Sequence, residues 1–229
     1  MPTHLLTGAG SGIGAAIGRR LHGRGDRLVL LARSDERAAE LAREYQGAAT
    51  LVADLADPAG LERLLTGADL PESLDSVLHV AGAVELSPVA DLPIGQLREQ
   101  LDVNLIAPAV LTRACLPALR RAKGTVLFVN SGSGLRANPS WAAYAASKFG
   151  LRGFADALRA EEAGNGVRVS SVFPSRTATA MQEKVHEQEG KEYDPSEWIT
   201  PDTVADAILH VLDLPPEATI PELVVKVTA

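Results

Sequence analysis

A tyrosine and a lysine stand four residues apart in the stretch YAASKFG, at Tyr144 and Lys148. In a helix this spacing places the phenol and the ammonium group one turn apart on the same face. A free tyrosine has a pKa of about 10, and a nearby cation in a site partly closed to water lowers that pKa. Such a phenol can exchange a proton with a carbonyl or alcohol oxygen. The alternative is a half-buried tyrosine beside a solvated surface lysine.

A glycine-rich stretch, TGAGSGIG, follows the first apolar run of the chain and contains Gly8, Gly12 and Gly14. Glycine allows a tight turn and lets the backbone approach a ligand closely. The helix expected after it offers free N–H groups and a positive dipole end to a pyrophosphate. Elsewhere such a stretch would be an ordinary turn, but at a first strand–helix junction it predicts nucleotide binding.

The whole chain supplies the alternation of strands and helices that such a loop requires. Its Val- and Leu-rich runs are continuous, as is typical of strands covered on both faces, and segments of helical spacing separate them. We therefore predict one α/β domain over residues 1–229, a Rossmann-type, doubly wound, seven-stranded parallel sheet with about six helices on its two faces. The expected strands span residues 4–8, 27–32, 49–54, 76–82, 124–131, 167–174 and 222–227.

Composition narrows the possible classes of protein. The 229 residues are 46% hydrophobic and 22% charged, which is a globular composition. A net charge of −7 without a basic stripe argues against a nucleic-acid partner. No apolar run reaches the length of a membrane span, and no secretory signal is visible. The single cysteine, Cys115, fits a reducing compartment, so we expect a cytoplasmic protein in which Cys115 serves packing.

No metal site is expected, because no His, Cys, Asp and Glu residues have the spacing of metal ligands. His79 is interpreted as a hydrogen-bonded histidine within a strand rather than a ligand. Thr200 and Pro201 predict the start of a helix, as its N-cap and its first residue.

In order and spacing these elements resemble the short-chain dehydrogenase/reductase family, over essentially the whole chain. The family's loop reads T-G-x-x-x-G-x-G and its catalytic pair Y-x-x-x-K. Ser131 lies thirteen residues before Tyr144, and Asn104 lies in LDVNL, where the family has its catalytic serine and asparagine. The resemblance implies that Tyr144 donates or accepts the proton and that Lys148 lowers its pKa and binds the nicotinamide ribose. Ser131 would bind the substrate oxygen, and Asn104 would hold a water that joins Lys148 to solvent.

The resemblance also implies a cofactor site. Asp54 matches the acidic residue at the adenine edge, and Thr179 in PSRTAT matches the threonine that holds the nicotinamide carboxamide. Val80 replaces an asparagine that ties neighbouring strands, so packing is expected to hold them instead, and Ser175 replaces a glycine and narrows the pocket floor. The expected cofactor-binding residues are Gly8, Ser11, Gly12, Ile13, Gly14, Arg33, Ser34, Asp54, Leu55, Ala81, Gly82, Tyr144, Lys148, Pro174, Thr177 and Thr179.

The end of the second strand indicates which dinucleotide binds. An enzyme that prefers NAD carries an acidic residue there, but the sequence has Ala32 at that position. Arg33 follows and can form a bidentate pair with a phosphate, while Ser34 adds a hydroxyl. We therefore expect NADP(H) to be preferred over NAD(H). The alternative is a solvated Arg33 and an enzyme that accepts both cofactors.

The sequence therefore predicts an NADP-dependent oxidoreductase that interconverts a carbonyl and a secondary alcohol. The alternatives are a non-catalytic cofactor sensor, or an epimerase or dehydratase that retains its nicotinamide. The small-molecule substrate is expected to meet an apolar pocket, formed by Trp141, Val84, Leu135 and Met181.

Two further expectations concern segments around this site. Residues 180–198 carry six acidic residues and two lysines and follow Thr179, so we expect a mobile lid; the alternative is a solvated surface helix. A helix over residues 139–162 presents more apolar side chains than one buried face needs, which favours a homodimer or homotetramer. These side chains are Phe149, Leu151, Phe154 and Leu158.

Overall fold

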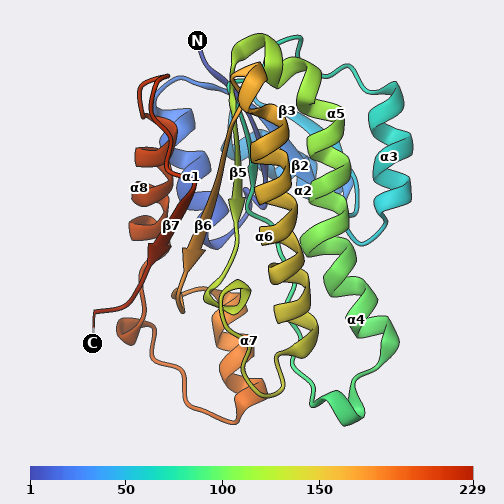
Figure 1. The fold of residues 1–229 in the computed structure, drawn as a ribbon, viewed down its shortest axis with the longest axis vertical. Coiled ribbons are helices and arrows are strands. Elements are labelled where there is room, and N and C mark those ends of the chain that lie inside the picture. Colours follow the sequence, from blue (N-terminus) through green and yellow to red (C-terminus); the bar gives the residue numbers. More distant parts are fainter. Residues whose placement is uncertain (229) are drawn as a thin grey trace.

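The computed structural model describes residues 1–228, which form one seven-stranded sheet (Figure 1). All six strand pairings are parallel, and the strand order is β3-β2-β1-β4-β5-β6-β7. The predicted fold class is confirmed, and each expected strand is present with slightly different ends. The strands are β1 (Thr3–Thr7), β2 (Arg27–Ala32), β3 (Ala49–Val52), β4 (Ser76–His79), β5 (Thr125–Val129), β6 (Arg168–Pro174) and β7 (Glu222–Val225).

Helices cover both faces of the sheet, and alternate strand residues point to opposite layers. In β1, Leu6 packs toward α1, α2 and α8, whereas Leu5 packs toward α3, α5 and α6. Both leucines are completely buried, which explains why the strands are apolar throughout. The helices are α1 (Gly12–Gly23), α2 (Asp35–Glu44), α3 (Pro58–Gly67), α4 (Ile94–Leu101), α5 (Ala107–Ala122), α6 (Ala142–Glu162), α7 (Ala180–Glu189) and α8 (Pro201–Leu212).

The estimate of about six helices was too low, since the described residues contain eight. Part of the error lies in α7, which falls inside the stretch expected to be a polar lid. The hydroxyl of Thr179 accepts a hydrogen bond from the Gln182 N–H at the start of α7, and Gly190 ends it with a left-handed φ of 65°. Only Gln182, Val185 and His186 are buried on this helix, so its sequence lacks a clear apolar stripe.

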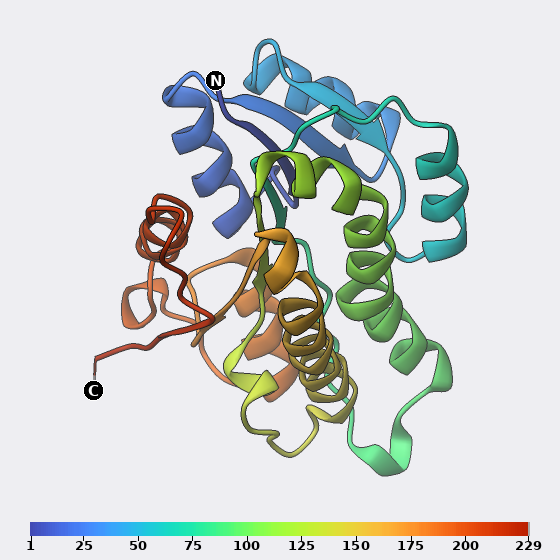
Figure 2. The ribbon, with the colours of Figure 1, turned by 45° about the horizontal axis from the view of Figure 1, so that its top comes forward.

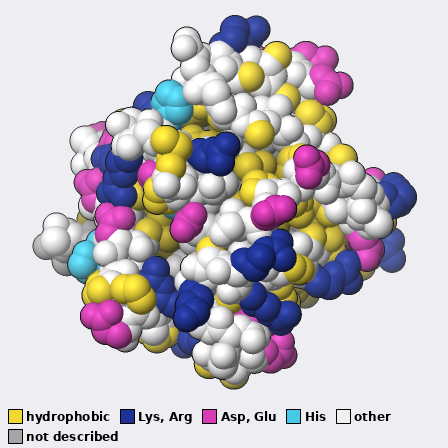
Figure 3. All heavy atoms as spheres, turned by 90° about the horizontal axis from the view of Figure 1, so that it is seen from above, with side chains coloured by type: hydrophobic (Ala, Val, Ile, Leu, Met, Phe, Trp, Pro, Cys, Tyr) yellow, Lys and Arg dark blue, Asp and Glu magenta, His cyan; other side chains and the backbone are white. Residues whose placement is uncertain are grey.

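From β1 the chain adds β2 and β3 on one side of the sheet and then β4 to β7 on the other, so the direction of winding reverses between β1 and β4. A cleft lies at the carboxyl ends of the strands there. In a doubly wound sheet this reversal is where ligands bind. The arrows in Figure 1 point toward the end of the molecule that carries α7. In Figure 2, where the amino ends of the strands are tilted forward, this helix, drawn in orange, is largely hidden behind α6. The face at the amino ends, seen in Figure 3, has positive and negative side chains interspersed.

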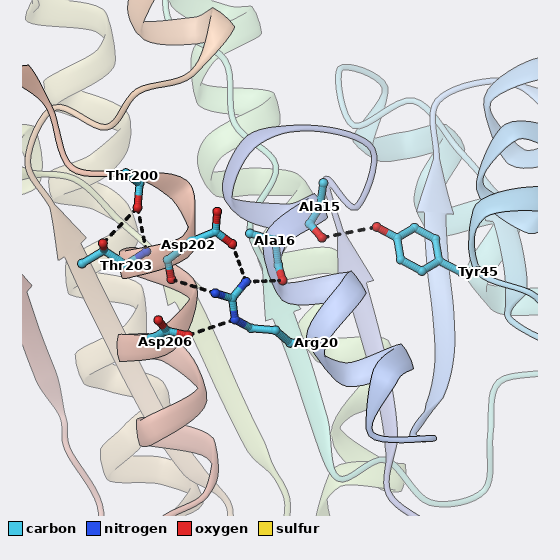
Figure 4. A network of polar contacts seen from close by, with 8 residues as sticks. All are labelled: Ala15, Ala16, Arg20, Tyr45, Thr200, Asp202, Thr203 and Asp206. Carbon is cyan, nitrogen blue, oxygen red and sulfur yellow. Dashed lines mark hydrogen bonds and ion pairs between the residues drawn. The ribbon is translucent and has the colours of Figure 1, made fainter. Parts of the chain in front are cut away.

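The helix that carries the glycine loop, α1, is tied to the last helix, α8 (Figure 4). Arg20 on α1 donates hydrogen bonds to Asp202 at 2.6 Å and to Asp206 at 2.9 Å on α8. The start of α8 agrees with the sequence, because Thr200 accepts a hydrogen bond from the Thr203 N–H at 3.1 Å. The contacts of Arg20 hold α1 and α8 side by side on one face of the sheet.

The continuous helical segment Ile94–Ala122 consists of α4, the π-helical turn and α5. By length and composition alone it could cross a membrane. Ile94 and Ile106 in this segment are exposed, but other apolar side chains belong to the core. Leu111, Cys115 and Leu119 are completely buried in the layer between the sheet and α3 and α6. The expectation that Cys115 is a packing residue is confirmed, and burial raises the pKa of its thiol to about 12.

Candidate active site

A cleft of about 760 Å³ at the carboxyl ends of the strands brings together nearly all predicted site residues. The glycine loop lies on one side and the residues of the Tyr144 turn on the other. Of the four expected catalytic residues, Ser131, Tyr144 and Lys148 line the cleft, whereas Asn104 lies behind it. Every expected cofactor-binding residue, from Gly8 to Thr179, also lines it.

The glycine loop approaches the end of β4 so closely that a side chain would not fit. Gly8 has a φ of 77°, and a Cβ there would lie 2.9 Å from the backbone nitrogen of Ala81. The hydroxyl of Thr7 accepts hydrogen bonds from the N–H groups of Val80 at 3.0 Å and Ala81 at 3.1 Å. The expectation that packing alone joins the strands at Val80 was therefore wrong, because Thr7 ties them through backbone N–H groups.

The start of α1 fits the pyrophosphate of a dinucleotide. Its N-cap residue, Ser11, makes no side-chain capping hydrogen bond, in contrast to Ser34, Thr179 and Thr200 at other helix starts. The first N–H groups of a helix have no intrahelical partner, and here they face the cleft beside the glycines. These residues would hold a bound pyrophosphate by backbone hydrogen bonds and the helix dipole.

Tyr144 and Lys148 lie one turn apart on α6, as predicted, and both are buried. The ammonium nitrogen of Lys148 is 5.7 Å from the centre of the Tyr144 ring and donates a hydrogen bond to the main-chain oxygen of Val129 at 3.0 Å. Ser131 follows β5, and its hydroxyl accepts a hydrogen bond from the Ser133 N–H at 3.1 Å. The strand end and the helix turn thus place three polar side chains around one point of the cleft.

Burial dominates the ionisation of both groups in the free protein. Desolvation raises the pKa of Tyr144, and only the nearby Ser131 side chain opposes this rise. Burial lowers the pKa of Lys148 to about 8. The expectation that Lys148 brings the tyrosine toward neutrality therefore does not hold for the free protein, because desolvation penalises the phenolate and the ammonium alike.

Asn104 is buried and lies outside the lining of the cleft. It lies in a π-helical turn, Asp102–Ile106, between α4 and α5. Its side-chain oxygen accepts a hydrogen bond from the Ala83 N–H at 2.8 Å, and its nitrogen donates to the Ala83 oxygen at 2.8 Å and the Ser147 hydroxyl at 3.0 Å. The amide is therefore committed to protein partners and braces the turn after β4 against α6. The role expected for Asn104, holding a water that joins Lys148 to solvent, stays a prediction.

Comparison with known protein families identifies the family of this chain. Residues 2–190 match the model of the family described as short chain dehydrogenase. The chain belongs to the short-chain dehydrogenase/reductase family. An uncharacterized short-chain type dehydrogenase/reductase of Sinorhizobium fredii is 32% identical over 216 residues, which cover 92% of this chain and 85% of that protein.

Solved structures similar to this short-chain dehydrogenase/reductase contain nicotinamide dinucleotides. The alcohol dehydrogenase of the archaeon Thermococcus sibiricus, in complex with 5-hydroxy-NADP, has a TM-score of 0.83 and 27% identity, covering 98% of this chain and 96% of that one. A 4-hydroxyisoleucine dehydrogenase in complex with NADH has a TM-score of 0.86 and 25% identity, with coverages of 99% and 97%. The comparisons support a nicotinamide cofactor and leave the choice of dinucleotide open.

The rim of the cleft near β2 carries two arginines. Arg33 is exposed and forms no ion pair with any residue of 1–228. Ser34 caps α2 by accepting a hydrogen bond from the Arg37 N–H at 3.3 Å. The sequence analysis missed Arg37, which lines the cleft, donates to the Gly10 oxygen and pairs with Glu40. The available signal was a second basic residue in the first turn of α2.

The segment after β6 lies between the cleft and the C-terminal strand. Ser175 lines the cleft, but its hydroxyl accepts a hydrogen bond from the Val227 N–H at 3.1 Å, so that group points toward the end of the chain. Thr179 donates to the Thr177 oxygen at 3.2 Å while it caps α7. A contact between Thr179 and the carboxamide therefore stays a prediction.

The wall around Tyr144 is apolar. Val84, Val185, Leu86 and Trp141 pack with the Tyr144 ring, and Trp141 meets it edge-on with centroids 5.7 Å apart. Trp141, Val84 and Met181 line the cleft as expected. Leu135 does not, because the 3-10 turn Gly132–Gly134 carries the chain away before this residue.

Helix α7 closes this side of the cleft through polar contacts at both edges. Glu85, in the loop after β4, binds Lys184 and Gln188, and the Leu86 N–H donates to Gln188 at 2.9 Å. On the other edge Arg176 forms a bidentate pair with Glu189, at 2.7 and 2.8 Å. Most residues of α7 are exposed, as the alternative of a solvated surface helix predicts, and these side chains hold it in place. A mobile lid over residues 180–198 stays a prediction.

His79 behaves as a buried structural residue, as expected. Its ring forms a hydrogen bond of 2.8 Å with the Thr112 hydroxyl and stacks on Phe128 at 4.9 Å between centroids. Burial lowers the pKa of its imidazole to about 3, so the ring is neutral. Within residues 1–228, no group of three or more His, Cys, Asp and Glu side chains is arranged to hold a metal ion.

Proposed function

We propose that the protein is an NADP-dependent oxidoreductase that interconverts a small apolar carbonyl compound and the corresponding secondary alcohol. The observation that carries this proposal is that Ser131, Tyr144 and Lys148 meet in the same cleft as the glycine loop and the start of α1. Membership of the family supports oxidoreductase chemistry, and the apolar wall of Val84, Trp141 and Val185 supports an apolar substrate.

A bound nicotinamide would supply or accept the hydride at the carbonyl carbon. In the direction of reduction, Tyr144 donates its phenolic proton to the substrate oxygen as negative charge develops there. Ser131 donates a hydrogen bond from its hydroxyl group to the same oxygen, which stabilises the developing charge. Lys148, while protonated, stabilises the phenolate that Tyr144 leaves behind. In the direction of oxidation, the phenolate takes the proton from the alcohol.

The test is a panel of ketones, aldehydes and secondary alcohols, including acetophenone as an apolar model ketone, with NADPH or NADP+ absorbance as the readout. We expect turnover to be greatest with apolar members and weak with charged ones. Cofactor binding without turnover of any member would contradict the proposal and favour a cofactor sensor. A cytoplasmic location stays part of the proposal.

We expect Arg33→Ala to remove most of a preference for NADPH over NADH. A hydrogen bond to a charged group contributes about 1.5–3 kcal/mol, so the preference in kcat/KM should be about ten- to a hundred-fold. Ala32→Asp should shift the preference toward NADH, because a carboxylate binds the ribose hydroxyl and repels a 2′-phosphate. The measurement is kcat/KM with each dinucleotide at a fixed carbonyl concentration.

Arg27→Ala is the matched control, since Arg27 is an exposed arginine at the opposite end of β2. It should leave the preference unchanged. Arg37→Ala separates the two arginines of the rim, and a loss of preference in that variant alone would assign the phosphate to Arg37. Equal kcat/KM values for NADH and NADPH in the unmodified protein would refute the preference.

We further propose a homodimer or homotetramer that associates through α6 and the long helix before it. Of the side chains on which this expectation rested, Leu151 and Leu158 are buried in the core, whereas Phe149 on α6 is 44% exposed. Ile106 in the π turn is a second large apolar side chain that is exposed, at 42%. Multi-angle light scattering should give two or four times the monomer mass. Phe149→Glu should shift the protein toward the monomer, and a monomeric mass for the unmodified protein would contradict the proposal.

A further inference from the structure

Asn130 lies between the end of β5 and Ser131, and both ends of its buried side-chain amide are used. Its oxygen accepts a hydrogen bond from the Ser131 N–H at 2.9 Å. Its nitrogen donates to the main-chain oxygen of Lys148 at 3.1 Å. The Asn130 amide therefore links Ser131, which follows β5, to Lys148 on α6.

This link holds Lys148 from two sides. Its ammonium group binds the oxygen of Val129 at 3.0 Å, and its main chain binds the side chain of the next residue, Asn130. Asn130 is itself fixed to the sheet, because its N–H donates to the Val172 oxygen on β6 at 2.8 Å. Lys148 is thus placed relative to the sheet rather than only relative to its own helix.

The neighbouring sequence leaves room for this amide. A Cβ at Gly134 would lie 2.3 Å from the side-chain oxygen of Asn130 and 3.1 Å from the main-chain oxygen of Lys148. Contacts shorter than 3.0 Å do not occur for real Cβ atoms, so any side chain here would displace the amide. Gly134 and Asn130 are therefore coupled positions, and Gly134 offers an independent way to disturb the same link.

We infer that Asn130 is a positioning residue that sets Ser131 and Lys148 relative to Tyr144. Proton transfer needs the three groups at fixed separations, and a displacement of about 1 Å can cost roughly a hundred-fold in rate. A buried amide with both ends bonded holds two backbones more rigidly than either contact alone. The inference rests on the proposed function, because it presumes the roles given to Ser131 and Lys148.

A purely structural amide would lower stability and leave turnover per folded molecule unchanged. Thr112→Val is a matched control for that effect. Thr112 is buried and its hydroxyl makes a hydrogen bond of 2.8 Å with His79, between β4 and α5 and outside the cleft. The control removes one buried hydrogen bond with little change in volume.

The experiment compares Asn130→Leu, Asn130→Asp, Gly134→Ala and Thr112→Val with the unmodified protein. Asn130→Leu removes both hydrogen bonds at similar volume, while Asn130→Asp keeps the acceptor for the Ser131 N–H and removes the donor to Lys148. The readouts are kcat and KM with acetophenone, the Kd of NADPH alone from its fluorescence, and the thermal unfolding midpoint. Asn130→Asp and Gly134→Ala keep the test decisive if Asn130→Leu does not fold.

We expect kcat to fall roughly ten- to a hundred-fold in Asn130→Leu and Gly134→Ala, with KM for acetophenone little changed. We expect NADPH to bind more weakly in all three cleft variants, because each releases Lys148. Thr112→Val should lower only the unfolding midpoint. The inference would be overturned if the cleft variants had the same kcat and the same Kd for NADPH as Thr112→Val.

Failure of the proposed function gives a different pattern. If the unmodified protein turns over no carbonyl of the panel, the proposed reaction is refuted. The NADPH affinities then decide the inference, with unchanged values in Asn130→Asp and Gly134→Ala counting against it. Full turnover by the unmodified protein and by the folded cleft variants would leave the reaction intact and refute the positioning role alone.

Discussion

Tyr144→Phe should abolish turnover while the cofactor still binds. The change removes only the phenolic oxygen that carries the proton, and the ring keeps its packing against Val84, Trp141 and Val185. General acid–base groups contribute about a hundred- to ten-thousand-fold, so kcat should fall at least about a hundred-fold. The measurement pairs kcat with the Kd of NADPH, which should stay within about threefold of the unmodified protein.

Tyr193→Phe provides the matched control for the loss of a phenol. Tyr193 follows α7, packs near His186 at 5.2 Å between ring centroids, and lies outside the lining of the cleft. It should retain nearly full activity. Residual turnover above a tenth in Tyr144→Phe would mean that another group or water delivers the proton, and the role assigned to Tyr144 would be wrong.

Lys148→Met should abolish or severely reduce activity and yet make the protein more stable. Burial lowers the pKa of Lys148 from 10.5 to about 8, which means that the folded state disfavours its charge. A shift of that size corresponds to about 3 kcal/mol at about 1.4 kcal/mol per unit, before the loss of the bond to Val129 is counted. We expect the free energy of unfolding to rise by about 1–3 kcal/mol near neutral pH, measured by urea denaturation.

The pH dependence of this gain has a definite sign. Below about pH 8 the lysine is charged in both the folded and the unfolded state, so the cost of burying the charge is complete. As the pH rises from about 8 to 10.5, the folded state releases its proton first and the unmodified protein recovers stability. The advantage of Lys148→Met should therefore be largest below pH 8 and shrink above it.

Lys226→Met is the control for removal of a lysine charge, since Lys226 is exposed near the end of β7. It should change stability little at any pH. Lys148→Met should also weaken NADPH binding, because the ammonium group is expected to contact the ribose. A variant with unchanged cofactor affinity would refute that contact, and a variant less stable than the unmodified protein at neutral pH would refute the buried-charge account.

The fold could be predicted from the sequence because buried parallel strands have a distinctive pattern. Continuous apolar runs, such as the one that became β5, pack on both faces and cannot be mistaken for half-exposed strands. The sequence analysis gave helix α7 only as the alternative to a lid, because its stability comes from capping by Thr179 and Gly190 and from pairs such as Arg176–Glu189. Those contacts depend on tertiary placement and leave no apolar periodicity.

The sequence predicted which residues form the candidate site, but not how deeply each is buried or how burial shifts its pKa. The spacing of Tyr144 and Lys148 followed from helix geometry alone. Their pKa values depend on how deeply the cleft buries them, which no local pattern reports, and the expected lowering for Tyr144 was wrong for the free protein. Arg37 and Asn130 were missed because their importance arises from contacts with Gly10, Ser131 and Lys148 across the fold.

The most direct test of the central claim is to follow a label from NADPH to the product. NADPH that carries deuterium at the transferring position of the nicotinamide is incubated with the protein and the best carbonyl of the panel, and the alcohol is examined by mass spectrometry. With the unmodified protein we predict an alcohol that carries deuterium on the former carbonyl carbon. With Tyr144→Phe we predict that no labelled alcohol is formed. Alcohol without deuterium, or label transfer that survives intact in Tyr144→Phe, would contradict hydride transfer assisted by Tyr144.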